Sequence, residues 1–374
     1  MMKQNRLCLL FLLLILGFAT CQASDKKKVS VDGPYVMYNE AGQMRVIRMD
    51  QKGRLLDSVY PKIPKNYMLD VFSNNGKRHF QVKLHPFSRP AWENGAREKT
   101  LVISDPHGDL ESFIAVLQNN GVIDKNYNWI FGKNQLVVIG DVFDRGEDVL
   151  PIYWLMYKLE QEALEAGGIM TFLLGNHEEM VLRNNLKYTR SKYKNLAEKL
   201  NIEYPGLWNG ESELGRWLQT RNLMQVIGKD LYVHAGLSPE FSRMNYSIPA
   251  VNEEVGKTIL LDQAGRKALS EMSDSIYSTY GGPFWYRGMV KNEDRYHPVY
   301  MDEVDQILKQ YQVDRIFVGH TIFDNVTSFY GKKVVAVNVD NKKNREKGRT
   351  RGMMIQNGQL YWVYDKGEPQ KYPY

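Results

Sequence analysis

Side chains that can bind metal ions follow five short apolar segments of this sequence. Segments 100–104, 135–140 and 171–174 precede a carboxylate or an amide, and segments 230–233 and 315–319 precede a histidine. The side chains concerned are those of Asp105, His107, Asp141, Asn176, His234 and His320. Imidazole nitrogens combined with carboxylate and amide oxygens, without a thiolate, suit Mn, Fe or Zn rather than Ca. The pattern therefore predicts a centre for divalent metal ions.

Asp141 is the expected bridge between two ions, because a carboxylate can give one oxygen to each of them. Two ions about 3.5–4 Å apart stabilise both the attacking and the leaving oxygen of an in-line displacement, and they lower the pKa of bound water toward neutrality. The chemistry expected of such a centre is hydrolysis of a phosphate ester by water, without a covalent phosphoenzyme.

Composition excludes two other kinds of phosphate chemistry. Cys8 and Cys21 are the only cysteines and both lie near the N-terminus, so the folded body has no thiolate nucleophile. No G-x-x-x-x-G-K-[ST] motif for nucleoside triphosphates is present. The formal net charge of +6 says little about partners.

The same segments also indicate the strands and helices that must position the ligands. Runs that are apolar at successive positions are typical of strands buried on both faces in a layered α/β fold. Residues 110–117, 148–165 and 301–311 have helical spacing, and their alternation with the strands predicts an α/β architecture. Ligands bind beyond the carboxyl ends of strands in such sheets, so the six side chains should meet at one edge. One such motif alone is usually an ordinary turn, but the presence of a possible metal ligand after each of five apolar segments argues against a chance pattern.

Five motifs in this order resemble those of the metallo-dependent phosphoprotein phosphatases, within the calcineurin-like superfamily. They are SDPHGD (104–109), GDVFDRG (140–146), GNHE (175–178), HAG (234–236) and GHT (319–321). WYRG (285–288) makes the chain similar to the bacterial, Shewanella-like branch. The similarity spans about residues 97–340. It implies a layered α/β/β/α metallophosphoesterase sandwich.

The resemblance implies a phosphoric monoester hydrolase of the serine/threonine-protein phosphatase type. Its substrates would carry phosphoserine, phosphothreonine, phosphotyrosine or a small aryl or alkyl phosphate, attacked directly by a hydroxide that bridges the two metals. Phosphorylated proteins, peptides or small molecules are thus the expected partners, and nucleic acid is not. Two alternatives stay open: a nucleotide or diadenosine polyphosphate hydrolase, and an exported metal-binding protein without turnover.

Site roles also follow from the resemblance. His177 would be the general acid, with Asp144 fixing its tautomer, while Arg145 and Arg287 would grip phosphate oxygens from opposite walls. For Arg287, a structural ion pair is the alternative. One metal would be held by Asp105, His107 and Asp141, and the other by Asp141, Asn176, His234 and His320.

The chain departs from the family pattern at two places. Ser104 stands where the first motif usually has glycine, and residues 335–341 replace the eukaryotic C-terminal signature. Close to the second departure, the basic stretch 342–351 is interpreted as a solvated loop.

Residues 1–23 predict a cleaved signal peptide, with a basic start, an apolar stretch and small residues before the cut. The apolar stretch covers about 12 residues, where a membrane span needs about 20. The protein is therefore expected to be exported, periplasmic or secreted, with a membrane anchor only if Cys21 is lipidated.

Residues 24–95 predict a β-rich module, and residues 96–365 a catalytic domain with inserted cap segments 184–229 and 239–299. The oligomeric state is left open.

Overall fold

The computed structural model describes residues 30–373, and the apolar segments before the predicted ligands lie in two six-stranded sheets. The first sheet has the order β17-β16-β15-β7-β8-β9, in which β7, β8 and β9 are parallel. Its strands are β7 (Lys99–Ser104), β8 (Gln135–Ile139), β9 (Ile169–Leu173), β15 (Gly352–Gln356), β16 (Gln359–Val363) and β17 (Gln370–Lys371).

The second sheet has the order β13-β14-β12-β11-β10-β6, with β11, β12 and β14 parallel. Its strands are β6 (Glu93–Asn94), β10 (Met224–Ile227), β11 (Asp230–Val233), β12 (Arg315–Val318), β13 (Thr327–Phe329) and β14 (Val334–Ala336). β10 lies inside the predicted inserted segment 184–229, so part of that segment belongs to the sheet rather than to a cap.

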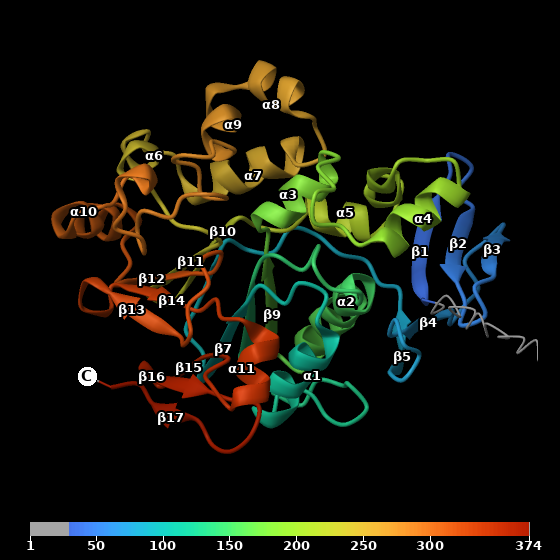
Figure 1. Cartoon of the computed structure of the whole chain (residues 1–374), viewed down its shortest axis with the longest axis horizontal. Helices are drawn as coiled ribbons and strands as arrows, with labels where there is room; N and C mark the ends of the chain where they lie inside the picture. Colours follow the sequence, from blue (N-terminus) through green and yellow to red (C-terminus); the bar gives the residue numbers. More distant parts are fainter. Residues whose placement is uncertain (1–29, 374) are drawn as a thin grey trace, which may run out of the picture.

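The two sheets stack face to face, and helices cover their outer faces (Figure 1). Val137 and Ile139 of β8 belong to the core between the sheets, together with Phe317 of β12. Leu136 and Val138, which alternate with them, belong to the core under the helices. Because both faces of β8 are buried, its sequence is continuously apolar. The predicted layered α/β/β/α fold is confirmed.

The predicted helices are present where the spacing placed them. They are α1 (Leu110–Asn119), α2 (Val149–Glu165) and α10 (Met301–Tyr311). Asp109 caps α1, because its side chain accepts a hydrogen bond from the backbone N–H of Ser112 at 3.1 Å. α1 thereby begins directly after the first predicted ligands.

Further helices lie above the carboxyl ends of the strands and at the sides of the sheets (Figure 1). In the middle of the chain they are α3 (Asn176–Leu182), α4 (Ser191–Lys199), η1 (Tyr204–Trp208), α5 (Glu213–Gln219), α6 (Pro239–Arg243), α7 (Ile248–Thr258), α8 (Gln263–Leu269) and α9 (Glu271–Ile276). Nearer the C-terminus are η2 (Asp294–Tyr296), η3 (Tyr330–Lys332) and α11 (Asn341–Lys347).

The interpretation of residues 342–351 as a solvated loop is wrong. Most of this stretch is helical in α11, and Arg351 beyond it is only 2% exposed and forms an ion pair with Asp365. A buried guanidinium needs such a partner, and nothing in the local charge run indicates one 14 residues downstream.

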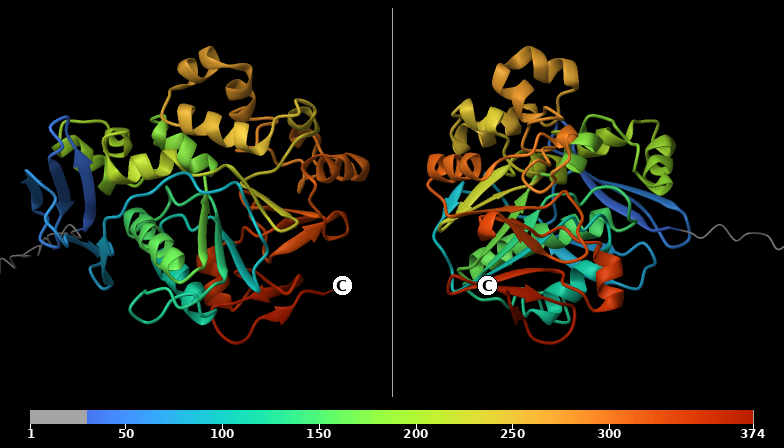
Figure 2. Two further views of the ribbon diagram at one scale, coloured as in Figure 1. Left: turned by 180° about the vertical axis from the view of Figure 1, so that it is seen from behind. Right: turned by 60° about the vertical axis from the view of Figure 1, so that its left-hand side comes forward.

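Near the N-terminus the chain forms strands only, in a three-stranded antiparallel sheet and a hairpin. These are β1 (Asp32–Tyr38), β2 (Met44–Met49), β3 (Leu55–Tyr60), β4 (Met68–Phe72) and β5 (His79–Lys83). Figures 1 and 2 place this module at one side of the molecule, next to α4 and α5. Trp154 of α2 donates a hydrogen bond to the Pro34 carbonyl at 2.9 Å, and Tyr35 shares the main hydrophobic core. The division into separate domains stays a prediction.

The predicted signal peptide and the Cys21 lipidation site lie outside the described residues. Within residues 30–373, no helix combines the length and the apolar character that crossing a bilayer requires.

Candidate metal centre

The backbone turns sharply at the ends of the strands that carry the predicted ligands. Asp105, His107, Asp141 and His320 have positive φ angles of 50°, 42°, 56° and 60°. Non-glycine residues rarely adopt this left-handed region, and each instance costs of the order of 1–3 kcal/mol. Strain of this kind persists where the surrounding structure fixes it, and here it directs four ligand side chains to one edge.

Glycines allow the ligand loops to approach each other closely. A Cβ on Gly140, whose φ is 70°, would lie 2.6 Å from His234 Nδ1 and 2.7 Å from Gly175 Cα. A Cβ on Gly175 would collide with Asp141 Oδ1. The glycines of the GDVFDRG and GNHE motifs are therefore required by the packing of the ligands themselves.

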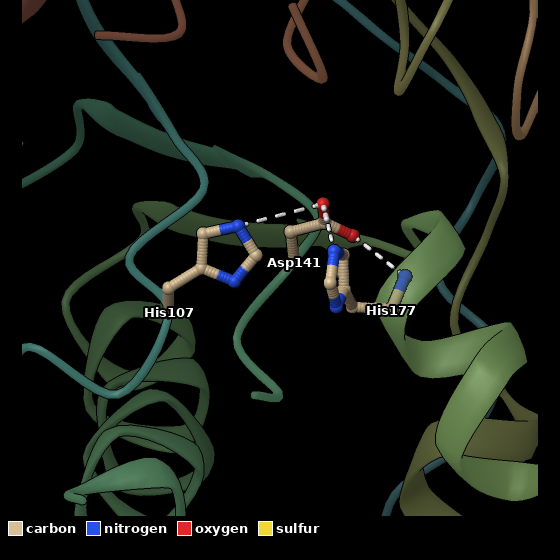
Figure 3. Close-up of side chains that lie close together, drawn as sticks. All are labelled: His107, Asp141 and His177. Carbon is tan, nitrogen blue, oxygen red and sulfur yellow. Dashed lines mark hydrogen bonds and ion pairs between the residues drawn. The ribbon is translucent and has the colours of Figure 1, made fainter. Parts of the chain in front are cut away.

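Asp141 lies at the middle of the cluster. Its Oδ2 atom is 3.4 Å from His234 Nε2, 3.8 Å from His107 Nε2 and 3.9 Å from His177 Nε2. Figure 3 shows the imidazoles of His107 and His177 directed at this carboxylate. Asn176 joins the group through Oδ1, which is 3.0 Å from His234 Nε2. One carboxylate thus faces donors from several loops, as the predicted bridging role requires.

Backbone carbonyls orient two of the imidazoles. His107 Nδ1 is 2.8 Å from the Phe143 carbonyl, and His234 Nδ1 is 3.1 Å from the Ile139 carbonyl. Because a carbonyl only accepts, both Nδ1 atoms carry a proton, which leaves the Nε2 lone pair of neutral His107 facing the centre. His234 Nε2 faces only the acceptors Asn176 Oδ1 and Asp141 Oδ2, so it also carries a proton, which a bound metal ion would displace.

Two buried atoms at the centre have no hydrogen-bond partner among residues 30–373: Asp105 Oδ1 and His320 Nε2. The other oxygen of Asp105 accepts hydrogen bonds from the Ser104 hydroxyl and, at 3.1 Å, from the His320 N–H. Buried polar atoms are normally satisfied, so two orphans beside Asp141 indicate a missing ligand. The serine that departs from the family pattern thus holds the Asp105 carboxylate in place.

Electrostatics point the same way. Burial, together with the charge of Asp141, raises the pKa of Asp105 to about 7. Burial lowers the pKa of His107 to about 4, which keeps its imidazole neutral and able to coordinate. At His234 burial opposes protonation, but the charges of Asp141 and Asp105 outweigh it and raise the pKa to about 9. Crowded carboxylates that hold protons on themselves and on an imidazole form a site that a divalent cation would stabilise. The residues present therefore fit the metal ions that the sequence predicts.

The described residues form two candidate coordination groups that share Asp141. One contains His107, Asp141 and His177, and the other contains Asp141, His234 and His320, with the ligand atoms of each within 4.8 Å of one another. The second group agrees with the predicted assignment. The first includes His177, the predicted acid, whereas Asp105 reaches the centre through Oδ1 without belonging to either group.

His177 also contacts Asp144, a carboxylate outside the two coordination groups. Its Nδ1 atom lies 2.6 Å from Asp144 Oδ2, and the other Asp144 oxygen accepts a hydrogen bond from the Thr189 hydroxyl at 2.7 Å. Burial opposes protonation of His177, but the charges of Asp141 and Asp144 outweigh it, so the pKa of His177 lies above its ordinary value. The predicted contact between Asp144 and His177 is confirmed.

The two predicted arginines lie on different elements near the centre. Arg145 is exposed, and its backbone N–H donates to the Tyr188 carbonyl at 3.1 Å. Arg287 is half-buried, and its Nη1 atom donates to the Thr321 hydroxyl at 2.9 Å. In the described part of the chain Arg287 forms no ion pair, so the structural ion pair considered for it is not found.

Glu178 is a site residue to which sequence reasoning gave no role. Its carboxylate accepts hydrogen bonds from the N–H groups of Asp141, Val142 and Gly175 at 2.8, 2.9 and 2.7 Å, and from the Tyr153 hydroxyl at 2.7 Å. It thereby joins two ligand loops. The signal was its place three residues after Gly175, the N3 position of a capping box.

Asn341 was also missed. Its Nδ2 atom donates to the carbonyls of Ser104 and Asp105, at 3.2 and 2.8 Å, so it holds the end of the strand that carries Asp105. It belongs to the stretch that replaces the eukaryotic signature, where family resemblance gives no assignment.

The fold and this site define a metal-dependent phosphoesterase, and comparison with known proteins agrees. Residues 98–323, more than half of the chain, match the model of the calcineurin-like phosphoesterase family. The chain belongs to this family.

The chain is also similar to particular phosphatases. It is 30% identical to Shewanella-like protein phosphatase 1 of Plasmodium berghei over 266 residues, covering 71% of this chain and 70% of that protein. It is 26% identical to Shewanella-like protein phosphatase 2 of Arabidopsis thaliana, covering 66% and 72%. The crystal structure of a cold-active protein-tyrosine phosphatase of a psychrophilic Shewanella species superimposes with a TM-score of 0.82 at 27% identity, covering 92% of this chain and 99% of that one. The chain is a metal-dependent phosphatase, and the predicted Shewanella-like resemblance is confirmed.

Proposed function

We propose that this phosphatase hydrolyses phosphomonoesters on proteins or peptides, with phosphotyrosine preferred over phosphoserine and phosphothreonine. The observation that carries the proposal is an exposed aromatic ring beside the acid. The Tyr188 ring is 39% exposed and its centroid lies 5.5 Å from that of His177. On another side, the half-buried Trp285 ring lies 6.0 Å from His320. Aromatic rings at these positions could stack on the leaving phenol.

The chain's own residues can bind the ester and supply a proton. Arg145 and Arg287 carry planar guanidinium groups that suit two phosphate oxygens each. His177 is held by Asp144 through Nδ1, which stabilises the protonated imidazole, and it presents Nε2 toward the centre, from which it can protonate the leaving oxygen. Divalent cations bound at the centre would supply an activated water and neutralise charge on the phosphate.

Two manganese ions are the proposed native complement, with iron and zinc as the alternatives that the donor set also accepts. The oxygen-rich share of the ligands, from Asp105, Asp141 and Asn176, supports manganese. Export to the periplasm or to the medium is also part of the proposal, and it rests on the sequence of residues 1–23.

A substrate panel with manganese tests the proposal. Phosphotyrosine and phosphoserine peptides of the same sequence, a small aryl phosphate and diadenosine tetraphosphate would be compared by kcat/KM. We expect the phosphotyrosine peptide to lead the panel. A preference for the dinucleotide would overturn the proposal. Activity that persists in Asp141→Asn and His177→Ala would trace the turnover to a contaminant.

A further inference from the structure

A cavity of about 540 Å³ opens beside the metal centre. Asp105 and His107 line it, together with the loop of Arg145 and the start of α11. A substrate whose phosphate reaches the metal ligands would therefore extend its neighbouring groups into this cavity. None of the roles assigned above uses the start of α11.

Four cations line the cavity: Arg145, Arg190, Lys342 and Arg345. Among residues 30–373, none of the four forms an ion pair with a carboxylate. The guanidinium of Arg145 lies 5.3 Å from the Tyr188 ring, and Arg190 donates to the Arg145 carbonyl. Arg345 is close enough to Glu111 and Asp365 for its charge to act toward a lower pKa of both carboxyls, but no carboxylate of the described residues contacts any of the four cations, so each can still bind an anion from outside the chain.

The acids that line the same cavity are already engaged. Glu111 forms a two-bond ion pair with Arg78 at 2.7 and 2.9 Å. Asp148 accepts from the backbone N–H of Asn74 at 2.5 Å. Asp109 caps α1 and Asp340 caps α11 through their side chains. Hydrogen bonds from N–H groups leave a carboxylate charged, so beyond Asp105 and the Glu111–Arg78 pair the cavity wall carries three acids against four cations, a small positive excess.

The basic side chains around α11 divide into two sets. Arg351 pairs with Asp365, while Lys343 and Arg349 both pair with Asp324. Lys342 and Arg345 are three residues apart, on one helix face, and both line the cavity. In the basic stretch, Lys343, Arg349 and Arg351 therefore form ion pairs within the chain, whereas Lys342 and Arg345 form none and line the cavity.

We propose that this cavity binds acidic side chains that flank the phosphorylated residue of a peptide substrate. The inference rests on the proposed protein-phosphatase function and names the substrate class within it. Exposed ion pairs contribute about 0.2–1 kcal/mol each, so two of them change kcat/KM by about twofold to 30-fold. The preference should weaken as salt is added, because exposed charges are screened.

The test uses two phosphotyrosine peptides that differ only in the flanking residues, acidic in one and the matching amides in the other. We expect the wild type to prefer the acidic peptide by about twofold to 30-fold at low salt. The double variant Lys342→Glu/Arg345→Glu should lose or reverse this preference while it hydrolyses a small aryl phosphate at the wild-type rate. That second readout shows that the variant is folded and that its centre is intact.

Lys347→Glu is the matched control, since Lys347 is exposed on the same helix and does not line the cavity. It should keep the wild-type preference. Equal kcat/KM for both peptides in the wild type, or an unchanged preference in the double variant, would overturn the inference. So would inhibition by inorganic tripolyphosphate that depends on Lys342 and Arg345 while the two peptides are hydrolysed equally. If the aryl phosphate is hydrolysed but neither peptide is, the proposed function itself fails.

Discussion

The Nδ1 atom of His177 lies 2.6 Å from Oδ2 of Asp144, and both side chains are buried. A carboxylate in this position fixes the imidazole tautomer and stabilises its protonated form, as a second group does in catalytic triads. Nε2 of the same ring lies 3.9 Å from the Asp141 carboxylate at the middle of the metal centre. His177 therefore faces the Asp144 carboxylate through one ring nitrogen and the metal centre through the other.

Replacing Asp144 with Asn should shift the pH dependence of kcat. Loss of the carboxylate charge destabilises protonated His177 and lowers its pKa. Activity that needs the protonated acid falls as pH rises through that pKa, so the falling limb should move to lower pH by about one unit or more. A pH–rate profile measures this, with metal content as the control. An unmoved limb would remove His177 from the role of acid.

His177→Ala separates the two roles that the geometry allows. If His177 is the acid, turnover should fall by about 100-fold or more while both metals stay bound. Metal analysis of the purified variant decides the question, because His177 also lies in a candidate coordination group with His107 and Asp141. Loss of one metal equivalent would place His177 among the ligands.

Glu178→Gln should destabilise the protein and loosen the centre. The carboxylate accepts from several N–H groups of two ligand loops, and an amide offers one acceptor atom in its place. Breaking a buried charged network of this kind costs about 3 kcal/mol. Urea unfolding of the metal-free protein would measure the loss. Glu346→Gln, at an exposed position, should leave stability unchanged, and an equal effect there would refute the assignment.

Asp32→Asn tests a buried carboxyl in the N-terminal module. Burial raises the pKa of Asp32 to about 6, although Lys192 and the Gly33 N–H oppose it. Between pH 3.8 and about 6 the folded state keeps this proton and the unfolded state loses it, so the stability that the group contributes falls as pH rises through this window.

Asn does not titrate, so the stability of Asp32→Asn relative to wild type should rise by up to about 3 kcal/mol from about pH 4 to about pH 7. Urea unfolding at the two pH values measures the difference. An identical difference at both would show that Asp32 is ionised in the folded state throughout.

Local sequence was sufficient to predict the strands and the ligands after them, because period and residue type are local properties. Asp141 and His234 are examples, since each follows a run that is apolar on both faces. Arg351 shows the limit of this reasoning. It reads as part of a solvated basic run, and only the folded chain brings Asp365 to it.

Other site features depend on contacts between distant segments. Asn341 holds the carbonyls of Ser104 and Asp105 across more than 230 positions of the chain. The Tyr188 ring lies beside that of His177 because of the course of its loop, and no periodic pattern in the sequence indicates this contact. Both candidate coordination groups include Asp141, whereas its bridging of two ions stays a prediction that rests on the chemistry of the carboxylate itself.

Asp141 is proposed to join two metal ions in one centre. Anomalous diffraction from crystals grown with manganese measures this most directly. We expect two anomalous peaks about 3.5–4 Å apart, one on each side of the Asp141 carboxylate, with Asp105 Oδ1 and His320 Nε2 among the ligands. A single peak, or peaks away from Asp141, would contradict it.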